Sequence, residues 1–224
     1  MLNKWQSEPL TNTNPSGTRY YFIMTLFNQR NIEAVYQLAT LTEQQDGITW
    51  YPKAYQIAQE LFARYDVTVA QVIGVIAALS PRNRWERNIQ DADAIISGYT
   101  SGGADQASKI KVCTFTSNKN KAIKILELAD GFQGMTEVLD ILSGPKMQEF
   151  ASCIAGESDA LCIDGHAYCI WAGERTGLAD VPSIGVKMRK AIKADYVKAA
   201  KKLGLTSSAL QAITWVTWRR LHGV

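Results

Sequence analysis

Residues 142–146 read Leu-Ser-Gly-Pro-Lys, and residues 161–167 read Leu-Cys-Ile-Asp-Gly-His-Ala. The Gly-Pro pair of the first stretch ends the helix expected over 135–142, because neither residue continues a helix well. The second stretch is a short apolar run that meets a helix at Asp164, the natural position of an N-cap. Together the two stretches predict a helical hairpin that carries Lys146 and, 18 residues further on, a helix that begins at a carboxylate.

Outward from these stretches, apolar residues recur at helical spacing along most of the chain, which predicts an all-α protein. Helices are expected over 19–38, 50–65, 67–79, 85–96, 119–128, 135–142, 147–155, 166–176, 185–203 and 207–221. The breaks between them include Gly47 and the glycine-rich loop 101–103. Only 160–163 has a strand-like pattern. The expected fold is all-α, with about ten helices and short connections.

The composition is that of a folded globular protein, since 46% of the 224 residues are hydrophobic and 20% are charged. The four cysteines form no Cys-x-x-Cys pair and there are two histidines, so no metal, iron–sulfur cluster or other cofactor is predicted. The N-terminus lacks an apolar signal segment, and no run approaches the roughly 18 apolar residues of a membrane span. We therefore expect a cytoplasmic protein with no membrane contact and no obligate protein partner.

The formal net charge of +3 divides unevenly along the chain. Residues 183–224 hold nine Lys or Arg against one acid, which gives this stretch a charge of +8 and leaves −5 for the rest. We expect a flexible polar arm over 1–18, a body over 19–182, and basic C-terminal helices over 183–224 that pack on the same domain. The basic end would attract a polyanion.

The helix expected over 185–203 separates apolar from basic residues. The residues expected to face inward are Val186, Ile192, Tyr196 and Leu203. The other side carries Lys187, Lys190, Lys198 and Lys201. A solvated basic face is the default interpretation of such a helix, but a single acid among nine bases favours contact with phosphates.

The turn expected near residue 80 mixes positive charge with an aromatic ring. Its candidate binding residues are Ser80, Arg82, Arg84, Trp85, Arg87 and Asn88. Such side chains suit stacking against a base that has left its helix. The alternative is an ordinary exposed helix start with the tryptophan packed beneath it, and the two interpretations have equal weight. Trp50 and Tyr51 are interpreted as core, and Trp215 as part of a helix that closes the fold.

Three segments in a fixed order resemble the helix-hairpin-helix DNA glycosylase superfamily, the fold of endonuclease III. Residues 163–166, Ile-Asp-Gly-His, are similar to the family's Val-Asp-Thr-His, in which the Asp is catalytic, and Lys146 stands where bifunctional members carry a Schiff-base lysine. Residues 78–96 resemble its Leu-Leu-Ser-x-Gln helix-turn-helix, and residues 115–123 resemble the helix start that precedes the hairpin. The hairpin here is two residues shorter than the family's and lacks its second glycine.

The resemblance implies a helical enzyme whose partner is DNA and whose substrate is a flipped-out base. Asp164 and Lys146 would be catalytic. An ordinary exposed lysine after a Gly-Pro turn is an equally weighted interpretation of Lys146, and a phosphate contact is a further one. Asn118, Lys119 and Gly144 would join the turn residues as contacts to DNA or substrate. His166 is interpreted as a further binding residue, with a structural hydrogen bond favoured over general-base work.

Three functions follow from this resemblance. The first is an N-glycosylase that removes a damaged or modified base. The second is a transferase that adds an amine or amino acid to an activated, pyrophosphorylated 5-hydroxymethyl-pyrimidine during hypermodification of phage DNA, in a bacterial cell or a phage-infected host. The third is a DNA-binding module without catalytic activity. The sequence favours the first.

Overall fold

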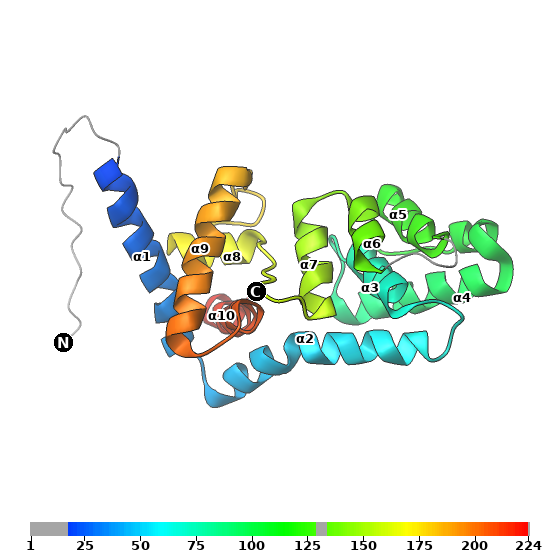
Figure 1. Ribbon diagram of the computed structural model, residues 1–224, viewed down its shortest axis with the longest axis horizontal. Helices are drawn as coiled ribbons and strands as arrows, with labels where there is room; N and C mark the ends of the chain where they lie inside the picture. Colours follow the sequence, from blue (N-terminus) through cyan, green and yellow to red (C-terminus); the bar gives the residue numbers. More distant parts are fainter. Residues whose placement is uncertain (1–17, 129–133, 224) are drawn as a thin grey trace.

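The computed structural model describes residues 18–128 and 134–223, with side chains from Asn28 onward. The described residues form ten α-helices and no strand, which confirms the all-α prediction (Figure 1). The helices are α1 (Thr18–Gln37), α2 (Leu41–Phe62), α3 (Val69–Leu79), α4 (Trp85–Lys109), α5 (Thr116–Leu126), α6 (Met135–Leu142), α7 (Pro145–Ala155), α8 (Gly165–Ala172), α9 (Val186–Leu203) and α10 (Ser207–His222). Nearly all of the arm expected over 1–18 lies outside the described residues.

The helices gather into two lobes with separate hydrophobic cores (Figure 1). The first lobe is built by α2 to α7, and its centre is α3, whose residues 71–79 are all buried. The second lobe is built by α1, α8, α9 and α10, with Ile32, Ile192 and Tyr196 fully buried between them. The second lobe therefore joins one helix from the beginning of the chain to three from its end.

The strand-like reading of 160–163 is wrong. These residues form an irregular link between α7 and α8. The run is apolar because it is buried between the lobes, and the backbone N–H of Ile163 donates to the Glu149 carboxylate at 2.8 Å rather than to another strand. A short buried link and a short buried strand have the same apolar pattern.

The break expected at Gly47 is also wrong, because α2 passes straight through this residue. A Cβ at Gly47 would lie 2.5 Å from both the backbone nitrogen and the Cα of Ile213 on α10. The glycine is thus required by the close crossing of two helices and does not end one. At 101–103 the expected interruption is a kink inside α4, where Gly103 has a φ of 66°.

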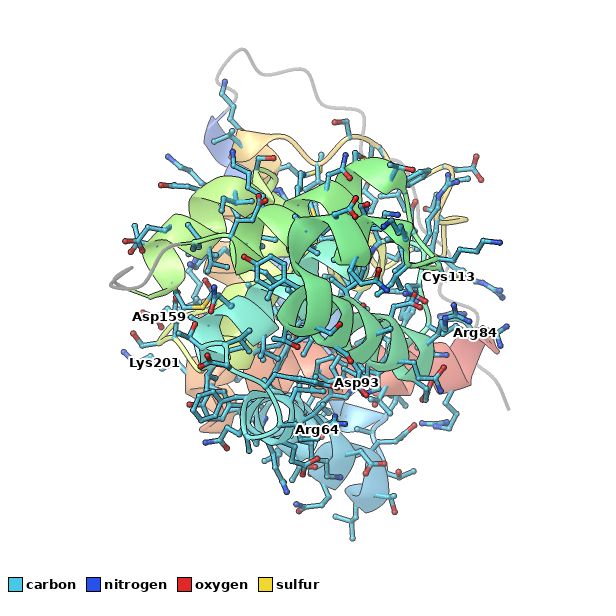
Figure 2. All side chains as sticks on the ribbon, turned by 90° about the vertical axis from the view of Figure 1, so that its right-hand side faces the viewer. Arg64, Arg84, Asp93, Cys113, Asp159 and Lys201 are labelled. Carbon is cyan, nitrogen blue, oxygen red and sulfur yellow. The ribbon has the colours of Figure 1, made fainter. Side chains whose placement is uncertain are left out.

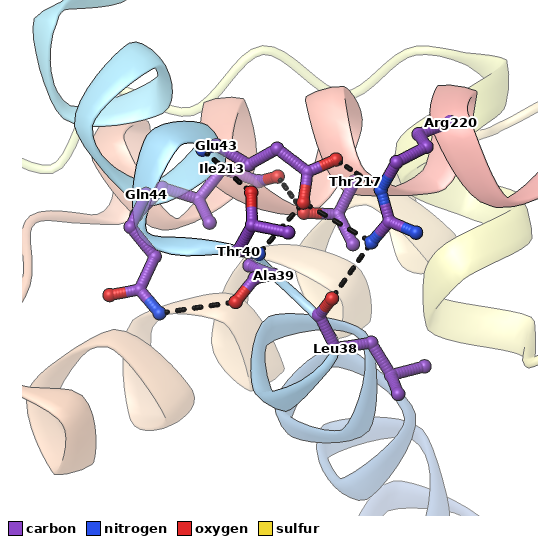
Figure 3. A network of polar contacts seen from close by, with 8 residues as sticks. All are labelled: Leu38, Ala39, Thr40, Glu43, Gln44, Ile213, Thr217 and Arg220. Atoms are coloured by element: carbon purple, nitrogen blue, oxygen red, sulfur yellow. Dashed lines mark hydrogen bonds and ion pairs between the residues drawn. The ribbon is translucent and has the colours of Figure 1, made fainter.

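Polar contacts lie beside the crossing of α2 and α10, at the beginning of α2 and near the end of α10 (Figure 3). Glu43 caps α2 by accepting the Thr40 backbone N–H at 2.8 Å, and it also accepts from Arg220 Nε at 2.6 Å. Arg220 in turn donates to the Leu38 carbonyl at 2.8 Å. The hydrogen bond from Arg220 lowers the pKa of Glu43. Two turns further along α2, the Tyr51 hydroxyl donates to Gln211 at 2.8 Å.

Helix α9 has the two faces that its sequence predicts. Ile192 and Tyr196 are buried, and the four lysines of the predicted stripe, Lys187, Lys190, Lys198 and Lys201, are exposed. Val186 is the exception, since it is exposed rather than inward-facing. It is the first residue of the helix and lies beyond the edge of the core.

We predict that Gly47→Ala lowers the free energy of unfolding by about 1–3 kcal/mol, because the new methyl group forces α2 away from Ile213. Denaturant unfolding followed by circular dichroism measures the change. Gly185→Ala is the control for the added methyl group, because a Cβ there meets no atom within 4 Å, and as the N-cap of α9 it should cost at most about 1 kcal/mol. An alanine at position 47 that stabilises the protein, as alanine does in an exposed helix, would contradict the crossing.

Candidate functional site

A cleft of about 920 Å³ lies where the two lobes meet. It is lined by α2, the turn between α3 and α4, the beginning of α7, residues 162–166, the loop before α9, and α10. The sequence-predicted residues that line it are Ser80, Arg82, Arg84, Trp85, Asn88, Lys146, Asp164 and His166. Residues from three separate segments of the chain thus meet in one cavity.

Asp164 and Lys146 both line this cleft, each near the beginning of a helix. The Asp164 carboxylate accepts the Ala167 backbone N–H at 2.9 Å, which confirms the predicted N-cap of α8. Lys146 follows Pro145, the first residue of α7, and its side chain is exposed. A catalytic role for either residue stays a prediction.

The hairpin between α6 and α7 turns on Ser143 and Gly144. Ser143 is the residue in the left-handed region, with a φ of 42°, whereas Gly144 is extended. A Cβ at Gly144 would make an ordinary contact at 3.4 Å with Met147. The turn therefore does not require glycine at 144, and this residue lies outside the lining of the cleft.

Four aromatic side chains form a wall of the cleft: Trp50, Trp85, Phe150 and Trp215. The Trp50 ring centre lies 5.0 Å from that of Trp85, 5.9 Å from that of Phe150 and 6.2 Å from that of Trp215. Flat rings of this kind can stack on a planar ligand.

Sequence reasoning missed three members of this wall, because it assigned Trp50 to the core and Trp215 to packing and gave Phe150 no role. Tyr51 is indeed buried, but neighbouring residues on a helix point about 100° apart. Trp50 therefore reaches the cleft from the same helical turn. Tyr51 lines the cleft as well, and Trp50 is half-buried against the first core. The available signal was the adjacent Trp-Tyr pair, whose two rings leave one helix in different directions.

The cleft lining carries more basic than acidic side chains, the acids being Glu86 and Asp164. Arg82, Arg84, Lys146 and Arg219 line the cleft. Arg82 has a φ of 58°, which is uncommon for a residue with a side chain. Its guanidinium lies over the Phe115 ring, 5.2 Å from the ring centre. Arg219 lies 4.8 Å from the ring centre of Trp215.

Two buried amides beside the turn present carbonyl oxygens that have no partner among the described residues. Asn88 is 1% exposed, and its amide nitrogen donates to the Ile76 carbonyl at 3.0 Å. The amide nitrogen of Asn83 donates to the Leu79 carbonyl and to Asp91. Because these neighbours are acceptors, each amide must keep its orientation and leave its oxygen free to accept a hydrogen bond.

The remaining predicted contacts lie away from the cleft. Arg87 pairs with Asp91 at 2.7 Å. Asn118 is buried and donates to Thr114, and the Lys119 ammonium donates to the Ser108 and Ile110 carbonyls at 2.6 and 3.1 Å. Lys119 thereby satisfies carbonyls at the end of α4. The lysines of the α9 stripe do not line the cleft either.

His166 lines the cleft beside Asp164, and its ring centre lies 6.5 Å from that of Trp215. Burial lowers the pKa of the His166 imidazole from its usual value of 6.5. The Asp164 charge opposes this shift, while the charges of Arg219 and Lys146 add to it. A neutral imidazole at pH 7 can accept a hydrogen bond from a ligand.

The described residues contain no group of three or more His, Cys, Asp or Glu side chains placed to hold a metal ion. Within the same part of the chain, no helix combines the length and the apolar character needed to cross a membrane.

The sequence model of a protein family matches residues 24–222, and that family is described as a family of unknown function, DUF7178. The chain belongs to this family. Searches of curated proteins and of solved structures gave no match.

We predict that a proton NMR titration places the midpoint of His166 below 6.5, because burial disfavours the imidazolium form. His166→Asn assigns the signal, since the chain has two histidines. Lys146→Gln should raise the midpoint and Asp164→Asn should lower it. A midpoint at or above 6.5 would contradict the burial of this side chain.

The same shift makes stability depend on pH. The unfolded chain binds the His166 proton more tightly than the folded protein does. The contribution of this group is therefore present above about pH 6.5 and is lost as the pH falls toward the folded-state pKa.

Proposed function

We propose that this DUF7178 member acts on a single DNA base that leaves the helix and enters the cleft, where it cleaves the bond between base and sugar. One observation carries the proposal: Lys146 and Asp164, which the sequence resemblance selects, line the same cavity as four aromatic rings. An extruded base needs a cavity with stacking surfaces and a few polar groups. The cleft offers both.

The chemistry assigned to each residue follows from its position. The aromatic wall stacks on the base and holds it out of the duplex. The Asp164 carboxylate stabilises positive charge on the sugar as the base departs, or activates the attacking nucleophile. The Lys146 amine attacks the sugar C1′ and loses a proton, while the glycosidic bond breaks and the base leaves with the bonding electrons and takes up a proton. Opening of the sugar ring then yields the Schiff base.

The basic side chains of the cleft lining favour a second candidate, the transfer of an amine or amino acid to a pyrophosphorylated 5-hydroxymethyl-pyrimidine. Arg82, Arg84, Lys146 and Arg219 suit an anionic leaving group, because charge-assisted hydrogen bonds hold phosphate oxygens well. In this reaction the sugar bond stays intact. Asp164 would activate the incoming amine.

We predict that Asp164→Asn lowers turnover by about 100-fold or more, because it removes the carboxylate charge. Asn is as good an N-cap as Asp, so the fold should be retained. Duplexes with candidate modified bases are incubated with the protein, and nucleosides are identified by mass spectrometry. A released base supports the glycosylase, and a heavier nucleoside supports the transferase.

Two further results complete this test. Borohydride should trap a covalent DNA adduct with the wild type but not with Lys146→Gln if Lys146 is the nucleophile, and Lys124→Gln, an exposed lysine on α5, is the matched control. If neither product forms, and Asp164→Asn and Lys146→Gln bind DNA like the wild type, the chain is a binding module and the proposal is wrong.

The lysines of the α9 stripe lie at different distances from the cleft. Pro182 and Ile184, which line the cleft, come just before the lysines at the start of α9. Lys201 lies at the opposite edge of the molecule from Arg84 when the protein is viewed along its long axis (Figure 2). A DNA backbone that delivers a base to the cleft therefore meets the start of α9 first.

We predict that Lys187→Gln with Lys190→Gln weakens binding to any DNA sequence more than Lys198→Gln with Lys201→Gln does. Fluorescence anisotropy at several salt concentrations measures the effect. Each lost phosphate contact should make the negative slope of log K, the association constant, against log salt less steep by about 0.9. Equal effects of the two pairs would show that the backbone follows another path, and a wild-type affinity independent of salt would exclude DNA.

A further inference from the structure

An ion pair between the lobes holds the chain directly before Asp164. Arg189 Nη1 on α9 donates to both oxygens of Glu149 on α7, at 2.8 and 2.7 Å. The two side chains are 17% and 24% exposed, so the pair is largely withdrawn from water. Partly buried ion pairs with short contacts are screened less by salt than surface pairs.

The ion pair binds both the backbone N–H and the backbone carbonyl of Ile163. Glu149 accepts the Ile163 N–H at 2.8 Å, and Arg189 Nη1 donates to the Ile163 carbonyl at 3.2 Å. Ile163 itself is 1% exposed, and Asp164 follows it in the chain. This link has no regular secondary structure, so the two side chains replace the backbone partners that a strand would have.

The same pair connects three parts of the proposed machinery. Glu149 lies three residues after Lys146 on α7, on neighbouring positions of one helix face. Arg189 lies on α9 between Lys187 and Lys190. One ion pair therefore fixes the Asp164 segment relative to the helix that carries Lys146 and to the helix that meets the DNA backbone.

We propose that Glu149 and Arg189 are positioning residues that set the place of Asp164 relative to Lys146. Neither residue lines the cleft, so neither touches the base. The catalytic consequence of this proposal rests on the proposed function. The contacts that hold residues 160–163 do not depend on that function, and they are tested without substrate.

The first test uses hydrogen exchange of the apo protein, measured by NMR. Arg189→Gln should accelerate exchange of the Ile163 amide by about tenfold or more, because Glu149 is no longer held over it, while the amide of Ile76 in the first core keeps its rate. Arg64→Gln is the control, since it breaks another arginine–carboxylate pair, between the turn after α2 and Asp93 on α4 at 3.3 Å (Figure 2). An unchanged Ile163 rate in Arg189→Gln overturns the proposal.

The second test uses turnover on the DNA substrate. Arg189→Gln should lower kcat by at least about tenfold with little change in KM, because a small displacement of a reacting group is costly while binding is kept. Arg189→Lys should recover most of kcat, because a single nitrogen makes all of the contacts to Glu149 and Ile163. Arg64→Gln should leave both constants unchanged.

The outcomes separate the two proposals. A loss confined to KM, or a kcat of Arg189→Gln equal to that of the wild type, overturns the positioning role. If the wild type turns over no DNA base, the proposed function fails, while the exchange rates still decide whether the pair holds the segment before Asp164.

Discussion

The crossing of α2 and α10 at Gly47 and Ile213 is the contact on which the arrangement of the lobes depends. The two backbones approach so closely that no side chain larger than hydrogen fits between them. Glu43 with Arg220 lies on one side of the crossing, and Tyr51 with Gln211 on the other. Because the lobes are joined along this line, the crossing sets how far apart the walls of the cleft stand.

Both of the helices that cross contribute aromatic rings to the cleft. Trp50 on α2 and Trp215 on α10 both reach it from positions beside the crossing, one from each lobe. The same region contains features that cost stability: an arginine with a positive φ, two buried amide oxygens without partners among the described residues, and a histidine whose charged form is disfavoured. Strained backbone and unsatisfied polar groups are found preferentially at functional sites.

Most of the helices could be predicted from local sequence patterns. The helix over 135–142 was predicted to the residue, the helix expected over 67–79 ends where α3 ends, and the cap at Asp164 was predicted from its place before a helix. What failed depends on contacts distant in the chain. Gly47 has the same local signature as a helix breaker, and its partner Ile213 is 166 residues away.

The site residues show the same difference between what local patterns predict and what depends on contacts distant in the chain. Eight predicted residues meet in the cleft, although they come from three separate segments of the chain. Lys119 and Arg87 do not, since their charges are used by a helix end and by Asp91. Arg189 was counted among the basic residues of the C-terminal end, but nothing near it in the sequence reveals Glu149, which lies 40 residues earlier. Charge alone does not distinguish a phosphate contact from an internal ion pair.

The order of the helices has a consequence for biosynthesis. Apart from Ala212 on α10, the core of the first lobe comes from one continuous stretch of chain, so most of it can close while the ribosome is still adding residues. Helix α1 emerges earlier but must wait, because Ile32 finds its partners on α8 and α9, the latter more than 150 residues later. The second lobe is thus completed only when α9 and α10 have left the exit tunnel. The part of the cleft that α10 and the loop before α9 form is completed with it. A nascent chain would expose Ile32 and Val35 of α1 until α8 and α9 have been added.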